Sequence, residues 1–433
     1  MDHSSASRID VVVVGAGPAG TAAAIALARA GRTVTLIDKA VFPRDKCCGD
    51  GLTTGALRRL EALGVRPETI PSWTWVDDVQ ITPPSGRRRT FPLPRHQGHF
   101  AAVATRFDLD NALVDLARTA GAEVLDGHTL TAASQHAGEV RLTIERPHGP
   151  NGAAGPDAAS GAIGRSGPLE LAAAHVIAAD GMWSPTRRLL GVTSPSDATT
   201  TYLGEWHGYR QYVSNVHTEA SRALWVWFDR EILPGYLWCF PSTNGTVNLG
   251  FGVERRPGFK TSEMKGLWDS LLTRPYLREV LGPEPIFGDS PKAWPIPCAP
   301  TNAALTDGRV LFVGDAARAC DVLTGEGIGQ ALQTGTMAAD AIIGAHTFSE
   351  AADRYESEVL HHLGPDHRMA STLEHMMRSR VIANGAVAIS GSTDWTRRNF
   401  ARWLFEDYPR GIALTPRRWR RGVMSGVGAY VGS

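Results

Sequence analysis

Apolar runs that end in glycine mark three places along the chain. The first spans residues 9–14 (IDVVVV) and leads into GAGPAG, and the second is VIAAD, which ends at Asp180-Gly181. The third is VLFVGD, which ends at Gly314-Asp315. Short β-branched and apolar runs bounded by glycine are typical of strands buried on both faces. The pattern therefore predicts an α/β sheet whose strand ends present bare backbone and carboxylates, where such sheets bind ligands.

The segment from residue 15 to residue 38 has the order of a dinucleotide-binding unit. After GAGPAG comes TAAAIALARA, which predicts a helix, and a second strand follows at 33–37. We expect Gly15 to make the tight turn, Gly17 to let a pyrophosphate approach the backbone, and Gly20 to allow close helix–strand packing. The free N–H groups of the helix start suit phosphates, and Asp38 suits a ribose hydroxyl. These residues alone leave FAD and NAD both open.

Alternation marks a different kind of strand in LPGYLWCFPSTNGTVNLGFG, from residue 233 to residue 252. The Asn-Gly pair at 244–245 is a strong signal for a hairpin. Period-two alternation places Tyr236, Trp238 and Phe240 on one face of the first strand. Spacing leaves two interpretations open, because the three rings suit either the wall of an apolar pocket or an aromatic stripe in the core of a sheet.

Composition narrows the class of protein. The 433 residues are 43% hydrophobic and 20% charged, which is ordinary for a globular chain of two or three domains. Lys+Arg and Asp+Glu both number 44, so the net charge gives no reason to expect nucleic acid as a partner. Five cysteines, with Cys47 and Cys48 adjacent, favour a reducing cytoplasm over a disulfide framework or a metal site. We expect neither a signal peptide nor a membrane-spanning helix, which needs about 18 apolar residues in a row.

The two later glycine motifs select flavin once they are taken together with the first. We expect Asp180 to face the cofactor, Asp315 to accept from a ribityl hydroxyl, and the N–H groups near Gly327 and Ile328 to face the N1/O2 edge of a flavin. In this order the motifs resemble those of the para-hydroxybenzoate-hydroxylase-type flavoproteins, which include aromatic monooxygenases, halogenases and geranylgeranyl reductases. The resemblance implies FAD, a discontinuous Rossmann-like domain, a second domain on a mixed β-sheet, and an arginine near the FAD phosphates. Further expected cofactor contacts are Ala16, Ala19, Lys39, Cys48, Gly49, Arg106, Leu130 and Gly325.

Three segments resemble the geranylgeranyl reductase branch of that superfamily: FPRDKCCGDGLT, GYLWCFP and LTGEGIGQAL. One position departs from the family, which usually has a proline where this chain has Val322. A halogenase needs a lysine beside its tunnel, and Lys46 stands near the right loop. However, the Gly-Glu-Ser expected of halogenases is replaced by Gly-Asp-Gly at 49–51. We therefore rank a reductase above a monooxygenase, and both above a halogenase.

The resemblance implies that hydride from reduced FAD reduces a carbon–carbon double bond of a prenyl or other unsaturated apolar substrate. By its position in the family motif, Cys48 is the flavin-side cysteine, either a proton donor or a group that orients the flavin, and Cys47 is incidental. Asp50 is expected to shape the loop. The expected catalytic residues are Cys48, Tyr236 and Trp238, and the expected substrate pocket comprises Asp50, Tyr236, Trp238, Phe240 and Pro241.

Other functions stay open from the sequence. An FAD monooxygenase acting on an aromatic or polyketide-like molecule is the main alternative, and a non-enzymatic flavin- or lipid-binding role is the third. The chain has no second GxGxxG unit for NAD(P)H, so electrons are expected from NAD(P)H bound transiently or from a ferredoxin.

The remaining patterns bear on domain organisation. A Gly/Ala-rich tract at about 148–170 predicts a surface loop, and from Glu350 onward the chain turns helical, basic and aromatic. These last helices suit peripheral contact with a membrane surface, but packing on the FAD-binding domain with a solvated arginine face explains them better. The arginines in question are Arg397, Arg398, Arg402, Arg417, Arg418, Arg420 and Arg421. We expect an FAD-binding domain over 1–70, 101–190 and 301–350, a substrate-binding sheet domain over 71–100 and 191–300, and a C-terminal helical region over 351–433.

Overall fold

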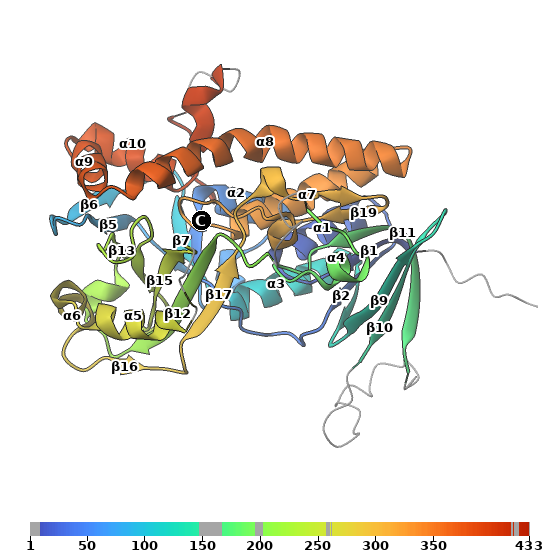
Figure 1. Ribbon diagram of the computed structural model, residues 1–433, viewed down its shortest axis with the longest axis horizontal. Coiled ribbons are helices and arrows are strands. Elements are labelled where there is room, and N and C mark those ends of the chain that lie inside the picture. The colour runs from blue at the N-terminus through green and yellow to red at the C-terminus, as the bar shows by residue number, and fades with distance from the viewer. Residues whose placement is uncertain are drawn as a thin grey trace, which may run out of the picture.

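A computed structural model describes residues 9–146, 167–194, 202–256, 260, 262–416, 419 and 424–432. Two β-sheets lie next to each other, and long helices cover one side of both (Figure 1). Most of the Gly/Ala-rich tract predicted as an inserted loop lies outside the described residues, as do Arg417, Arg418, Arg420 and Arg421.

The first sheet contains all three apolar runs of the sequence and has the order β18-β19-β11-β1-β2-β8, with β10 and β9 continuing from β11. Strands β1, β2, β8, β11 and β19 run parallel, so their carboxyl ends meet at one edge. That edge carries the first glycine loop, the Asp180-Gly181 pair and the Gly314-Asp315 pair, as the sequence predicts. The strands are β1 (Ile9–Val14), β2 (Val34–Asp38), β8 (Glu123–Asp126), β9 (Thr129–Gln135), β10 (Val140–Glu145), β11 (Leu169–Ala178), β18 (Thr306–Asp307) and β19 (Val310–Phe312).

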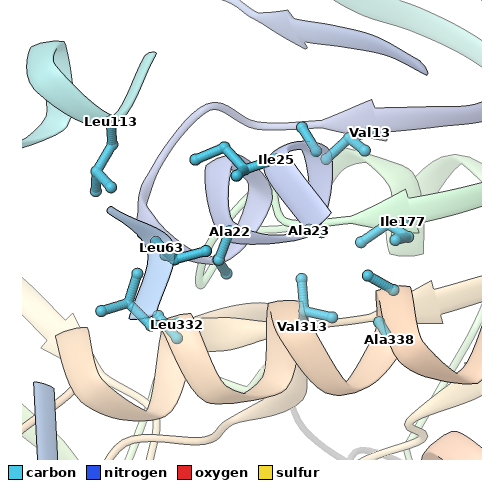
Figure 2. Packing of buried hydrophobic residues seen from close by; sticks show 14 of the residues in the cluster. Val13, Ala22, Ala23, Ile25, Leu63, Leu113, Ile177, Val313, Leu332 and Ala338 are labelled. Carbon is cyan, nitrogen blue, oxygen red and sulfur yellow. The ribbon is translucent and has the colours of Figure 1, made fainter. Parts of the chain in front are cut away.

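Small residues allow two helices to pack closely on this sheet. Helix α1 (Pro18–Arg29) and helix α7 (Ile328–Gly344) contact each other, with Ala22, Ala23 and Ala338 in the buried cluster between them (Figure 2). A Cβ added at Gly335 of α7 would lie 2.0 Å from the Ala19 carbonyl oxygen, so only glycine permits this approach. Two further helices complete this part, α2 (Thr54–Leu63) and α3 (Arg106–Thr119), and α4 (Pro185–Leu189) follows β11.

The second sheet has the order β16-β12-β15-β14-β13-β5-β6, with β17 paired to β12. It is mixed, because β13 runs parallel to β5 while the other pairs are antiparallel. The predicted hairpin is confirmed: Asn244 and Gly245 both have positive φ, at 57° and 69°. Its strands are β5 (Asp78–Thr82), β6 (Arg89–Pro92), β12 (Trp206–Ser214), β13 (Leu224–Trp227), β14 (Leu237–Pro241), β15 (Val247–Glu254), β16 (Ile286–Phe287) and β17 (Lys292–Ile296).

One face of the second sheet is closed by α5 (Glu263–Leu272) and α6 (Pro275–Leu281), with Leu237 and Cys239 of β14 in the shared core. The opposite face of β14 is turned toward the first sheet. A small third sheet, β3-β7-β4, joins the two parts of the molecule. Its strands are β3 (Gly51–Thr53), β4 (Thr74–Trp75) and β7 (Ala101–Val103). The fold therefore has the predicted α/β sheet and the predicted second, mixed β-sheet, whereas the exact domain boundaries stay a prediction.

The C-terminal helices span the molecule. Helix α8 (Phe348–Met377) runs along the first part, and α9 (Arg380–Ser390) and α10 (Asp394–Leu404) lie beside β5 and β6 (Figure 1). The expected solvated arginine face is wrong for Arg402, which is only 5% exposed and pairs with Asp407 at 2.5 Å. Arg402 turns inward because Asp407, three residues beyond the end of α10 at Leu404, pairs with its guanidinium.

Candidate cofactor and substrate site

A deep cleft lies between the parallel edge of the first sheet and the inner face of the second. It encloses about 1200 Å³ of empty space, part of it open to solvent, and we call it the cofactor cleft. The cleft is lined by the start of α1, the CCGDG loop, the strand β14 and the loop before α7, together with residues of β12, β15 and β17. Among the lining residues are Cys48, Arg106, Trp238, Asp315, Glu326 and Gly327.

The three glycines of the first loop are required for different reasons. Gly15 has φ +103°, and a Cβ on it would lie 2.3 Å from the Ala179 carbonyl oxygen. A Cβ on Gly20 would lie 1.8 Å from the Gly15 oxygen, so both positions exclude any side chain. Gly17 is different, because its backbone is extended and a Cβ would meet nothing closer than 3.9 Å. Folding does not need glycine at 17, whereas the approach of a pyrophosphate to the helix start does, and so the loop fits FAD.

Two guanidinium groups face this bare backbone. Arg44 Nη2 and Arg106 Nη2 are the atoms 3.9 Å from the Cβ position of Gly17. Asp110 holds both, since Arg106 makes two hydrogen bonds of 2.7 Å to its carboxylate and Arg44 makes one of 2.7 Å. Burial acts to raise the pKa of Asp110, but the charge and hydrogen bonds of Arg106, together with the charges of Arg44 and Lys46, outweigh it and hold the pKa below its ordinary value. The pair therefore forms an anion site beside the helix start.

Other expected cofactor residues lie in the first sheet or beside its parallel edge. Asp38 ends β2 and accepts from the Ala16 N–H at 2.7 Å, directly beside the glycine loop. Asp180 accepts from the Thr186 N–H at 2.8 Å, and its second oxygen is buried without a partner. Leu130 is buried in the core of the sheet, two residues after His128, whose N–H donates to the Asp38 carbonyl at 2.8 Å, and it is not among the residues that line the cofactor cleft. Lys39 is exposed beside Asp38, and Ala16 and Ala19 are buried in the turn.

The CCGDG loop is tied to the second sheet by a buried asparagine. Asn248 donates to the Cys48 carbonyl at 2.8 Å and to Asp50 at 2.7 Å, and it accepts from the Trp238 indole N–H at 3.0 Å. Tyr212 donates a further hydrogen bond of 2.5 Å to Asp50. The other carboxylate oxygen of Asp50 is buried and lacks a partner, which fits a bound group that brings an N–H donor into the cleft. Cys48 Sγ accepts from the Asp50 N–H at 3.4 Å.

Asp50 is expected to make stability depend on pH. Burial raises its pKa from 3.8 to about 6, against the opposing hydrogen bonds from Tyr212 and Asn248. Because folding raises the pKa of Asp50, its contribution to the free energy of unfolding is complete below about pH 4 and is lost as the pH rises through about 6. Relative to Asp50→Asn, the wild type should lose about 1.5 kcal/mol of unfolding free energy between about pH 5 and about pH 8. Guanidinium unfolding at constant excess FAD measures this, and parallel pH profiles of the two proteins would contradict it.

The predicted aromatic face lines the cleft. Tyr236, Trp238 and Phe240, which we call the aromatic wall, all line it, and the intervening residues of β14 lie in the opposite core. The bare backbone of the CCGDG loop packs against this wall, since a Cβ on Gly49 would lie 3.6 Å from Trp238 and one on Gly51 would lie 3.3 Å from Phe240. Pro241 is not a pocket residue: it lines neither of the cavities described here, because it continues β14 opposite Val247.

Five other tryptophans divide between the cofactor cleft and the hydrophobic cores. Trp206 lines the cleft, whereas Trp225 and Trp227 stack on each other in the core of the second sheet. Trp73 and Trp75 pack against the first core.

The loop before α7 closes the far side of the cleft. Asp315 lines it and is held by Lys46 at 3.2 Å and the Cys320 thiol at 3.3 Å. Gly325, Gly327 and Ile328 also line it, and α7 starts at Ile328 with its free N–H groups at this point. The arrangement supplies N–H donors where a flavin's N1/O2 edge is expected.

The cysteines of the loop are free thiols. Cys47 donates to the Lys292 carbonyl at 3.3 Å, and burial raises the pKa of Cys48 above its ordinary value. Within the part of the chain that is described, no group of three His, Cys, Asp or Glu side chains is placed to hold a metal ion.

A second cavity, which we call the apolar cavity, lies behind the aromatic wall. It has about 1100 Å³ of empty space and shares Tyr236, Phe240 and Glu326 with the cofactor cleft. Its other sides come from β5, β13 and the helices α8, α9 and α10, and nearly all are apolar. They include Val79, Val226, Leu373, Ala386, Val387 and Phe400.

Sequence reasoning did not assign five residues that the geometry brings to the site. Arg44 stands in the FPRDK segment and Asp110 one helical turn after Arg106, so both had a local signal. Tyr212 and Asn248 are polar residues inside strands, which gives no indication of a role. Glu326 stands between Gly325 and Gly327, so its place in the cofactor loop was visible in the sequence but its function was not.

Comparisons with known proteins agree with this geometry. A family model described as "FAD binding domain" matches residues 8–363. The chain is 33% identical over 355 residues to a menaquinone reductase of Mycobacterium tuberculosis, covering 77% of this chain and 76% of that protein. It is 31% identical to a digeranylgeranylglycerophospholipid reductase of Methanoculleus marisnigri, covering 81% and 82%. A geranylgeranyl bacteriochlorophyll reductase-like structure from Thermoplasma acidophilum superposes with a TM-score of 0.74 at 22% identity, covering 95% of this chain and 99% of that one.

Proposed function

Because the chain belongs to the geranylgeranyl reductase family of FAD-dependent oxidoreductases, we propose that it reduces carbon–carbon double bonds in a prenyl chain or a similar unsaturated apolar substrate. The observation that carries this proposal is the apolar cavity, which adjoins the cofactor cleft at Tyr236 and Phe240. A cavity lined almost wholly by apolar side chains suits a hydrocarbon chain better than a hydroxylated ring system. The names of the two relatives, which refer to a prenylated quinone and a prenylated lipid, support the same class of substrate.

The chain's own residues would hold FAD in an order set by the sheet. Arg44, Arg106 and the N–H groups beside Gly17 would bind the pyrophosphate, and Asp38 would accept from the ribose. Asp315 would accept from the ribityl chain, and the start of α7 would donate to the pyrimidine edge. Bound and reduced FAD supplies hydride at N5.

The remaining task of the protein is to align the double bond with the flavin, since an isolated double bond offers little charge to polarise. The aromatic wall would hold the alkene beside the flavin and exclude water. Asn248 fixes this wall and the Cys48 loop together through hydrogen bonds to both. We assign Cys48 to the flavin side of the cleft, where it orients the ring system or holds a proton.

Electrons are expected from NAD(P)H bound transiently at the mouth of the cleft or from a ferredoxin. Lys46 and Arg210 line the cleft and pair with Asp315 and Asp45, and Lys292 also pairs with Asp45, at 2.5 Å, so three cations and two carboxylates lie together there. Anaerobic mixing of the oxidised protein with NADPH, NADH or reduced ferredoxin, followed by flavin absorbance, identifies the donor.

We further propose that the enzyme is located in the cytoplasm and meets its substrate at a membrane surface through helix α9. No described helix is both long and apolar enough to cross a membrane. One face of α9 lines the apolar cavity with Ala386 and Val387, while its outer face exposes Val381 by 80% and Ile389 by 71%. A helix with two apolar faces, followed by the exposed Trp395, suits the headgroup region of a bilayer.

Replacement of this outer face should weaken lipid binding. We expect Val381→Asp combined with Ile389→Asp to lower co-sedimentation with anionic vesicles by about tenfold, because two exposed apolar side chains are lost from the lipid contact. Ile286→Asp is the matched control, since Ile286 is 60% exposed on β16 at the opposite side of the molecule (Figure 1). Absence of wild-type binding to anionic vesicles would reject membrane contact.

The fate of the reduced flavin tests the reductase against a monooxygenase. In a reductase, a prenyl alkene reoxidises the flavin without oxygen, and air yields only peroxide. A long-lived flavin hydroperoxide in air together with an oxygenated product would establish a monooxygenase instead.

A further inference from the structure

Three carboxyl groups, one buried and two half-buried, lie close enough to influence one another beside the cofactor cleft. They belong to Asp321 and Glu326 in the loop before α7 and to Glu406 just after α10. A third cavity, with about 1250 Å³ of empty space, lies on the other side of this group and is lined by Asp321, Glu406, Gln330 and Arg410.

Two of the three carboxyl groups have a cationic partner and one does not. Arg410 is fully buried and pairs with Asp321 at 2.9 Å and with Glu406 at 3.5 Å. Glu406 also accepts from Gln330 at 2.7 Å. Glu326 accepts one hydrogen bond of 2.9 Å, from the Gly329 N–H, and no ion pair to it is present among the described residues.

The position of Glu326 distinguishes it from every other acid of the site. It lines the cofactor cleft and the apolar cavity, and it is the sole carboxyl group among the described residues that line the apolar cavity. Cys48 lines the cofactor cleft alone. A carboxyl group that must reach an alkene held by the aromatic wall beside the flavin therefore has one candidate, since the Tyr236 hydroxyl, which also lines both spaces, donates its proton to the Thr324 carbonyl.

The surroundings keep this proton in place at neutral pH. Burial, followed by the nearby charge of Glu406, raises the pKa of Glu326 from 4.5 to about 8. At pH 7 the side chain is therefore mostly a neutral carboxylic acid. The titratable and charged groups whose electrostatic influence reaches it from the surrounding elements are Cys48, Arg59, Tyr236, Asp321, Glu406 and Arg410.

We propose that Glu326 donates the proton that completes reduction of the double bond. This inference rests on the proposed function. One alkene carbon gains hydride and the π bond breaks; the O–H bond of Glu326 then breaks as a C–H bond forms at the other carbon. The resulting carboxylate regains a proton from water, for which the third cavity, lined by Gln330 and Glu406, offers the source. The step needs no reagent beyond the hydride of reduced FAD and one proton from water.

Infrared spectroscopy tests the protonation of Glu326 without any substrate. The FAD-loaded wild type should show a band of a neutral carboxyl group that disappears as the pH is raised through about 8. Glu326→Gln should lack this band, whereas Cys48→Ser and the exposed Glu358→Gln should keep it. A band that survives Glu326→Gln unchanged would overturn the proposal.

Turnover tests the donation itself. With FAD content and melting temperature matched to the wild type, Glu326→Gln should slow anaerobic alkene reduction by at least about 100-fold, the usual contribution of a general acid. Glu358→Gln should leave the rate unchanged. A rate for Glu326→Gln within about twofold of the wild type would overturn the proposal. Failure of the wild type to reduce any alkene would overturn the proposed function, and donation by Glu326 with it, while the infrared result would still report where the proton is held.

Discussion

Gly17→Asp is expected to abolish FAD binding while leaving the chain folded. The backbone at 17 is extended, and the nearest atoms to an added Cβ are the guanidinium nitrogens of Arg44 and Arg106 at 3.9 Å, so a side chain can be placed there. An aspartate at this N-cap position should even stabilise α1 slightly, by roughly a few tenths of a kcal/mol relative to glycine. Its charge, however, would lie where the pyrophosphate must approach, and like charges at such distance cost several kcal/mol, which is about 100-fold or more in affinity.

The measurement is the FAD-to-protein ratio after gel filtration, together with the thermal unfolding of the flavin-free protein. Gly20→Ala is the informative control, because its Cβ would lie 1.8 Å from the Gly15 carbonyl oxygen and should destabilise the fold itself. Retention of FAD by Gly17→Asp would contradict the placement of the pyrophosphate.

Ala386→Phe is expected to lower kcat/KM for a long prenyl substrate by about 10- to 100-fold without changing FAD binding. Ala386 lines the apolar cavity from α9, and the added ring would occupy space needed by the hydrocarbon chain. Changes of a few carbon atoms in a hydrophobic pocket are worth about 1–3 kcal/mol in specificity. The loss should shrink for a shorter prenyl substrate, which leaves that part of the cavity empty.

Ala388→Phe is the matched control on the same helix, because Ala388 is exposed on its outer face. Steady-state kinetics with prenyl substrates of two lengths separates the two variants. Equal losses in both, or a loss independent of chain length, would contradict the use of the apolar cavity for substrate.

Local sequence patterns were sufficient to predict the parts of the site that depend on where strands end and on the alternation of side chains along a strand. The order of strand, glycine loop and Asp38 predicted the parallel edge correctly, because backbone geometry forces those residue types at those places. Alternation around Trp238 also predicted correctly which rings share a face, since side chains of a strand alternate by covalent geometry. The same rule could not decide between wall and core, because that depends on what packs against the face.

The remaining features depend on contacts between distant segments. Arg44 and Arg106 meet through Asp110, and Asn248 reaches the Cys48 loop from 200 positions away in the sequence. Arg402 was expected in solvent because the pattern of α10 does not show that Asp407 turns back toward it. Pro241 was expected in the pocket because the family motif includes it, whereas its place in the ladder opposite Val247 keeps it out.

The most direct measurement of the central claim is a single turnover without oxygen. The FAD-loaded protein is reduced to completion, mixed with an equimolar prenyl alkene, and followed by flavin absorbance and product mass. We predict that the oxidised flavin spectrum returns and that the product gains two hydrogen atoms for each flavin. A flavin that stays reduced until air is admitted, or a product that gains oxygen rather than hydrogen, would contradict the account.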